Sequence, residues 1–89
     1  MDESLRLFPS TAQVDAHGRL WLGGCLARDL AGRFGTPLYV YDAETLLARC
    51  AEARSALERY PGPRRLAYAS KAYLCLGLAQ LLERQGLDL

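Results

Sequence analysis

The sequence contains no uninterrupted apolar run near the ~18 residues that a membrane-spanning helix requires. Its start, Met-Asp-Glu-Ser, lacks the basic-then-apolar order of a signal peptide. Neither sign of charge dominates, because the formal net charge is +1 and acidic and basic residues are mixed along the chain. Such a balance gives no electrostatic footprint for nucleic acid or an anionic membrane surface. We therefore expect a cytoplasmic protein with neither nucleic acid nor membrane as a partner.

Cysteine and histidine are scarce as well. Cys25, Cys50 and Cys75 form no C-x-x-C pair and cannot all pair internally, which fits a reducing compartment better than a disulfide framework. With one histidine in the chain, the cysteines also make a poor zinc site, so we predict no metal.

The first third of the chain predicts a small β element followed by a helix. Residues 14–22 contain two β-prone arms around a polar turn, with Gly18 available for a positive φ angle, which indicates a hairpin or two edge strands. We expect His17 to be solvated in that turn and Trp21 to be an apolar anchor. Apolar residues then recur at helical spacing over residues 26–34, and Gly35 occupies the position of a helix C-cap.

The middle third predicts a strand and a longer helix. Residues 38–41, Leu-Tyr-Val-Tyr, are β-branched and aromatic and follow a proline, so we expect a strand there. Asp42 then has the character of an N-cap, and the helix should run to about Tyr60. Its apolar stripe consists of Leu46, Cys50, Ala53 and Leu57.

The last third repeats the strand–helix order. After the proline-rich loop at residues 60–63, residues 66–70 form a nearly all-apolar run that is typical of a buried parallel strand. A leucine-rich helix should follow and end near Gly86. This alternation predicts an α/β fold, yet one such strand cannot close a barrel or cover itself. Since residues 87–89 look like the start of another strand, we interpret the chain as a fragment of a larger fold.

Lys71 lies where the strand expected at residues 66–70 meets the next helix, and α/β proteins place reactive groups at such strand ends. Period-two geometry puts Ala67 and Ala69 on the face of Lys71, whereas the residues between them face the other way. Two small side chains leave room for a flat ring beside the amine, which suits a cofactor bound through an imine. Spacing alone leaves open that Lys71 is a solvated strand end or a salt-bridge partner.

A family resemblance extends this reading. Tyr-Ala-Ser-Lys-Ala-Tyr-Leu-Cys at residues 68–75 resembles the lysine motif of the pyridoxal-phosphate-dependent diaminopimelate decarboxylases, members of the alanine-racemase-like group that also holds ornithine and arginine decarboxylases. Further matches occur upstream in the family's order: Phe-Pro at residues 8–9, Leu-Gly-Gly-Cys at 22–25 and Phe-Gly-Thr-Pro-Leu-Tyr-Val-Tyr-Asp at 34–42. The resemblance covers about residues 8–89, nearly the whole chain.

The resemblance implies a fold, a cofactor and a reaction. Lys71 would be the catalytic and cofactor-binding residue that forms the internal aldimine with pyridoxal 5'-phosphate. The fold would be a TIM-like barrel joined to a β domain, with residues 1–35 contributing strands to the β domain and residues 36–89 forming the first, incomplete elements of the barrel. The reaction would convert meso-diaminopimelate to L-lysine and carbon dioxide in a homodimeric full-length enzyme, and the 89-residue piece alone would be inactive. The family's phosphate loop, ring partners and interface cysteine would lie beyond Leu89.

Three alternatives remain at this point. A decarboxylase of the same fold could act on ornithine, lysine or arginine. A non-catalytic pyridoxal-phosphate barrel protein would lack the β domain, so the expected hairpin argues against it. A stand-alone α/β interaction domain, with Lys71 as a surface charge, predicts cooperative unfolding of the isolated chain.

Three other residues carry rival interpretations. Cys75 would fall in the first turn of a helix, where the helix dipole favours a reactive thiolate, although a small buried packing residue is the commoner role. Arg64 and Arg65 have the guanidinium forks that grip phosphate, but they precede the strand, so we expect ordinary solvation or ion pairing.

Overall fold

The computed structural model describes residues 3–89. The chain forms two compact units, Met1–Leu46 and Leu47–Leu89. The first unit opens with a 3-10 helix, Glu3–Leu7, and contains the sheet; the second contains three of the buried apolar residues, Cys50, Leu78 and Leu82. No helix within residues 3–89 is long and apolar enough to cross a membrane.

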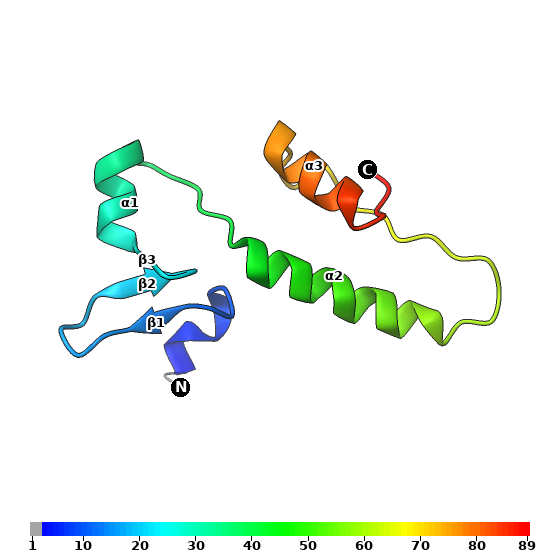
Figure 1. Ribbon diagram of the computed structural model, residues 1–89, viewed down its shortest axis with the longest axis horizontal. Helices are drawn as coiled ribbons and strands as arrows, with labels where there is room; N and C mark the ends of the chain where they lie inside the picture. Colours follow the sequence, from blue (N-terminus) through cyan, green and yellow to red (C-terminus); the bar gives the residue numbers. More distant parts are fainter. Residues whose placement is uncertain (1–2) are drawn as a thin grey trace. The chain divides into compact units, whose positions relative to one another are not determined.

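The sheet of the first unit is antiparallel, with three strands in the order β1-β2-β3 (Figure 1). β1 (Gln13–Val14) pairs with β2 (Leu20–Leu22), and β2 pairs with β3 (Cys25–Leu26). The hairpin predicted at residues 14–22 is therefore confirmed, although each strand is short.

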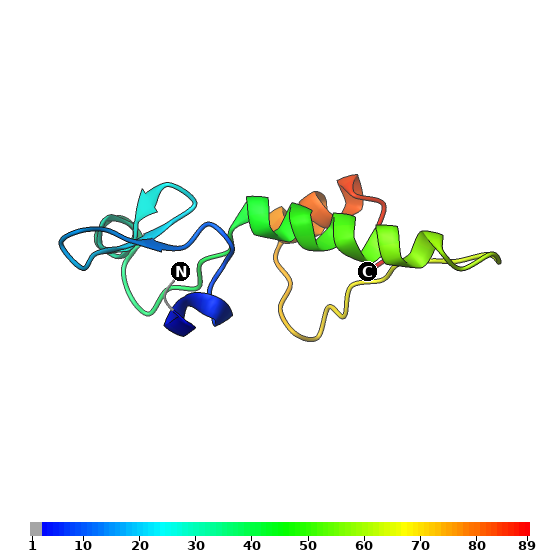
Figure 2. The same cartoon turned by 90° about the horizontal axis from the view of Figure 1, so that it is seen from below.

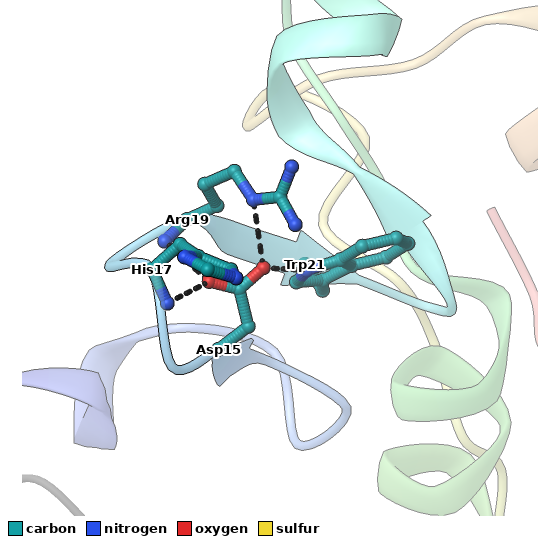
Figure 3. Close-up of polar contacts among 4 residues, drawn as sticks. All are labelled: Asp15, His17, Arg19 and Trp21. Atoms are coloured by element: carbon teal, nitrogen blue, oxygen red, sulfur yellow. Dashed lines mark hydrogen bonds and ion pairs between the residues drawn. The ribbon is translucent and has the colours of Figure 1, made fainter.

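The β1–β2 turn is built around the carboxylate of Asp15 (Figure 3). Asp15 accepts hydrogen bonds from the backbone N–H groups of His17 (2.8 Å) and Arg19 (3.0 Å), from Nε of Arg19 (2.9 Å) and from the indole Nε1 of Trp21 (2.9 Å). These donors, the Trp21 indole foremost, hold the pKa of the Asp15 carboxyl well below its usual range because they stabilise the ionised form. Trp21 thus anchors the hairpin through its indole N–H and is half-buried, and His17 is exposed in the turn as expected.

The helix predicted after the hairpin is also confirmed. α1 (Ala27–Phe34) follows β3 directly and packs against β2 and β3. It ends at Gly35, whose φ is +84° and whose N–H donates to the carbonyl of Ala31 at 2.8 Å. Glycine suits this position because it adopts positive φ without a Cβ penalty.

The strand expected at residues 38–41 is wrong. This segment has no strand pairing within the described chain, and Leu38, Tyr39 and Val40 are 38%, 83% and 40% exposed. β-branched and aromatic residues favour strands chiefly because they pack on a half-buried pleated surface. No described strand pairs with this segment, so it forms no part of a sheet.

Asp42 caps α2 (Ala43–Glu58), as the sequence indicates. Its Oδ2 accepts hydrogen bonds from the backbone N–H of Thr45 (3.1 Å) and from the hydroxyls of Thr45 and Thr11 (3.0 Å for Thr11). The Thr45 hydroxyl is the first of the causes that lower the pKa of the Asp42 carboxyl. The hydroxyl of Thr45 also accepts the N–H of Ser10 at 3.0 Å, so the cap fastens residues 10 and 11 to the start of the helix.

The predicted apolar stripe of α2 faces inward. Cys50 is buried, and the other three members of the stripe are half-buried, namely Leu46, Ala53 and Leu57. In the second unit, α3 (Leu76–Arg84) contributes the buried Leu78 and Leu82. The guanidinium of Arg54 on α2 donates to the carbonyl of Gln85 just after α3. The expected leucine-rich helix is confirmed, with its start at Leu76 and Gly86 at positive φ beyond its end.

The connection between α2 and α3 runs back along the helices before α3 begins (Figure 2). Ala67 in this connection forms a parallel bridge with Asp88, which follows α3. The N–H of Tyr68 donates to the carbonyl of Asp88 and the N–H of Asp88 to the carbonyl of Leu66, both at 2.8 Å. The strand expected over residues 66–70 is reduced to this single bridge, and the backbone turns at residues 70 and 71. Two parallel segments joined through a helix are an α/β arrangement.

Candidate functional site

Lys71 lies in a turn that follows this parallel segment. The N–H of Ala72 donates to the carbonyl of Ala69 at 3.1 Å, which places Ser70 and Lys71 at the two central positions of the turn. Cys75 and α3 follow four and five residues after Lys71. Lys71 therefore lies between a parallel segment and a helix, but α3 begins at Leu76, whereas the sequence predicts a helix directly after the lysine.

Exposure alternates along the approach to Lys71. Ala67, Ala69 and Lys71 are exposed, whereas the residues between them, Leu66, Tyr68 and Ser70, are half-buried. This alternation matches the two faces predicted from a period of two, even where formal strand pairing has ended. The open side of Lys71 is thus flanked by two methyl side chains.

The Lys71 side chain is exposed. Within residues 3–89 it makes no hydrogen bond or ion pair, so no described residue supports the salt-bridge alternative. Lys71 is also the only lysine of the whole chain. A primary amine condenses with an aldehyde with release of water, and a planar aldehyde could approach past Ala67 and Ala69 without meeting a branched side chain.

Two polar side chains on the half-buried face complete the neighbourhood. The Tyr68 hydroxyl donates to the carbonyl of Tyr73 at 2.5 Å, bridging from one side of the turn to the other. The Ser70 hydroxyl is buried and has no hydrogen-bond partner among the described residues. Sequence reasoning missed the role of Tyr68; the signal was a tyrosine at an inward position of the strand, since a half-buried phenol needs an acceptor.

Cys75 is exposed at the N-cap of α3, so the interpretation as a buried packing residue is wrong. The backbone N–H of Leu78 is the main cause that lowers the pKa of the Cys75 thiol, followed by the side chain of Tyr73. Donors at a helix start stabilise the thiolate, as the rival interpretation supposed. Cys25 and Cys75 are exposed thiols and Cys50 is a buried one, and none of the three forms a disulfide.

Lys71 lines neither of two pockets found elsewhere. One, of about 530 Å³, lies in the first unit beside Thr11, Trp21 and Gly23. The other, of about 360 Å³, lies in the second unit and is lined by Arg54, Arg64, Arg65 and Asp88 among others. Nε of Arg65 pairs with Oδ2 of Asp88 at 2.7 Å, and Arg64 donates to the carbonyl of Tyr60 at 3.5 Å. Both arginines are exposed, and Arg65 is ion-paired, which agrees with the expected solvation or ion pairing.

The chain is similar to several diaminopimelate decarboxylases. It is 38% identical over 82 residues to the one from Synechocystis sp., which covers 91% of this chain and 18% of that protein. It is 39% identical over 79 residues to the Bacillus subtilis protein, an alignment that covers 89% of this chain and 18% of that protein. It is 36% identical over 92 residues to the Mycobacterium leprae protein, with 99% of this chain and 19% of that protein covered. No family model and no solved structure matches. The chain thus spans about a fifth of the length of these curated relatives, while nearly all of it aligns with them.

Proposed function

Since this chain is homologous to one segment of the diaminopimelate decarboxylases, we propose that it is the N-terminal part of a longer enzyme that converts meso-diaminopimelate to L-lysine and carbon dioxide. The observation that carries the proposal is the similarity over 91% of the chain, which includes the turn that presents its one lysine. The proposed substrate is a small amino acid, and the proposed setting is the cytoplasm.

Lys71 is the residue that would hold pyridoxal 5'-phosphate. Its amine lacks a partner within residues 3–89, and its neighbours on the exposed face are Ala67 and Ala69. These features fit covalent attachment to the aldehyde of the cofactor. When bound, the cofactor supplies an electron sink for the pair of electrons left when carbon dioxide departs. The chain's own contribution is to fix the amine at one place and, as a base or acid, to take up or give a proton at the lysine nitrogen.

The architecture proposed for the full enzyme is a TIM-like barrel with a β domain. The parallel bridge between Ala67 and Asp88, with α3 between its two segments, supports residues 36–89 as the first elements of the barrel. The antiparallel sheet β1-β2-β3 supports residues 1–35 as a contribution to the β domain. In this assignment Lys71 lies at the carboxyl end of a barrel strand, where TIM-barrel enzymes carry their reactive groups. The full enzyme is proposed to be a homodimer, which light scattering of the purified protein tests.

Reduction with borohydride tests the role of Lys71. The full-length protein is incubated with pyridoxal phosphate, reduced, digested and mapped by mass spectrometry. We expect the pyridoxyl group on Lys71 and its loss in K71A. A pyridoxyl group on another lysine alone, or on none, overturns the assignment.

Release of carbon dioxide tests the substrate. The assay compares meso-diaminopimelate with ornithine, lysine and arginine at equal concentrations. We expect turnover of meso-diaminopimelate to exceed that of the other three. Preferential turnover of ornithine, lysine or arginine would assign a different substrate to the same fold. Cofactor binding without release of carbon dioxide from any of the four would favour a non-catalytic pyridoxal-phosphate protein.

A further inference from the structure

Tyr68 precedes Lys71 by three residues and is held at two points. Its backbone N–H donates to the carbonyl of Asp88 at 2.8 Å, which fixes it to the neighbouring parallel segment. Its hydroxyl donates to the carbonyl of Tyr73 at 2.5 Å. The side chain therefore spans from the last paired residue before the turn to a residue two positions beyond Lys71.

The loop closed by the Tyr68 hydrogen bond contains a smaller loop, which is closed by a backbone hydrogen bond. The N–H of Ala72 donates to the carbonyl of Ala69 at 3.1 Å and closes the turn itself. The Tyr68 side chain then closes the larger loop of residues 68–73 around that turn. Without the outer bond, one backbone hydrogen bond alone would fix the direction in which the Lys71 side chain leaves the chain.

We propose that Tyr68 is a positioning residue: its hydrogen bond to the carbonyl of Tyr73 holds the turn in the conformation that presents the Lys71 amine. This inference rests on the proposed role of Lys71 as the cofactor-bearing residue. Tyr68 acts through the backbone, because its side chain lies on the half-buried face while Lys71 and the two alanines lie on the exposed face.

The physical reason lies in the long lysine side chain. Its four-carbon stem is flexible, so attachment of a planar cofactor at one place requires a fixed backbone beneath it. A tyrosine hydroxyl provides this at little entropic cost, because the ring has only two rotatable bonds. A phenylalanine at this position would keep the packing of the ring and lose only the hydrogen bond across the turn.

The test uses the full-length protein with Tyr68→Phe, and Tyr60→Phe as the matched control. Tyr60 belongs to the same unit, is 56% exposed, and its hydroxyl makes no hydrogen bond in the described chain. Two quantities are measured on the apoprotein: amide hydrogen exchange of residues 69–75, and the rate at which added pyridoxal phosphate becomes trapped on Lys71 by borohydride. For wild type and both variants, kcat and KM are measured on the enzyme loaded with pyridoxal phosphate.

For Y68F we expect exchange of residues 69–75 to rise and trapping on Lys71 to slow by about threefold to tenfold, the factor that follows from loss of one intramolecular hydrogen bond. We also expect kcat to fall and KM for the substrate to stay within twofold of wild type, about the scatter of such measurements. Y60F should match wild type throughout.

Two results would overturn the proposal. One is equal exchange and equal trapping in Y68F and Y60F. The other is slow trapping in Y68F with unchanged exchange, which would make Tyr68 a direct cofactor contact. If the proposed function is wrong, borohydride would trap no pyridoxal phosphate on Lys71 of the wild-type protein. That result differs from both outcomes above. If Y68F does not fold, the wild-type apoprotein still tests the proposal. The backbone amides of residues 69–75 must then exchange more slowly than those of the loop at residues 61–65, and equal rates would refute the stabilising role of the Tyr68 hydrogen bond.

Discussion

A Cβ atom on Gly23 would lie 2.7 Å from Oδ1 of Asp42. Gly23 belongs to the turn between β2 and β3, and Asp42 is the cap of α2, so the bare backbone of the turn lies directly against the capping carboxylate. The N–H of Gly23 also donates to the Thr11 hydroxyl at 2.8 Å, and that hydroxyl donates in turn to Asp42. The sheet turn and the helix start share one hydrogen-bonded junction.

Substitution of Gly23 should therefore cost more than substitution of its neighbour. Gly23→Ala and Gly24→Ala both place a Cβ at positive φ (+55° and +80°), a strain of about 1–2 kcal/mol. Only the alanine at 23 also meets Asp42, since nothing lies within 4 Å of a Cβ at 24. We expect G23A to show the larger loss of hydrogen-exchange protection at the start of α2. Equal losses in the two variants would show that Asp42 moves aside freely.

Asp15 predicts a stability difference that depends on pH. Its folded pKa is depressed below the usual 3.8, so its contribution is fully present above pH 3.8 and is lost as the pH falls toward the lower folded value. We expect Asp15→Asn to be less stable than wild type at neutral pH and the gap to narrow below pH 3.8. Urea midpoints of the full-length protein and its D15N variant, with the Trp21 indole N–H followed by NMR, check this. A gap that widens with acid would contradict the assigned direction.

Leu82 and Leu76 provide a matched pair within α3. Leu82 is 2% exposed and Leu76 is 74% exposed. We expect Leu82→Ala to destabilise by about 2–5 kcal/mol, the usual cost of deleting a buried leucine side chain. Leu76→Ala should change stability by only about 0.5 kcal/mol, as is usual at a surface. Denaturant titration of both variants measures the difference, and similar losses would mean that residues outside this chain cover Leu76.

The isolated chain should not unfold cooperatively. Within residues 3–89 only four apolar residues are buried: Ala12, Cys50, Leu78 and Leu82. Large apolar side chains are exposed in every part of the described chain, for example Leu7, Phe34 and Tyr39 at 88%, 62% and 83%. We expect a gradual thermal transition by circular dichroism and binding of a hydrophobic dye. A single sharp transition without dye binding would instead favour a stand-alone domain.

The helices could be predicted from the sequence because their signals are local. Asp42 and Gly35 mark a helix start and a helix end through hydrogen bonds and backbone angles that depend on a few adjacent residues. The stripe around Cys50 follows from the period of the helix alone. The alternation of faces before Lys71 followed from strand geometry in the same way.

The remaining features depend on residues that are distant or on three-dimensional contacts. Residues 38–41 have strand propensity but no neighbouring described strand, so propensity alone gave a wrong prediction. The bond from Tyr68 to the carbonyl of Tyr73 needs the turn at residues 69–72, where the sequence predicts a strand that runs directly into a helix. The family resemblance singled out Lys71, but it carried no information on what holds the lysine's backbone in place.

The bridge between Ala67 and Asp88 has a consequence for folding during translation. Parallel segments must be joined by a long crossover, which normally delays their pairing. Here the crossover contains α3, a helix whose turns form from local contacts, and both partners belong to one continuous stretch of 22 residues counted from 67 to 88. Once Asp88 has left the ribosome, this pairing needs nothing that is still to be translated. The turn that carries Lys71 can therefore be ordered before the later parts of a longer protein have been made.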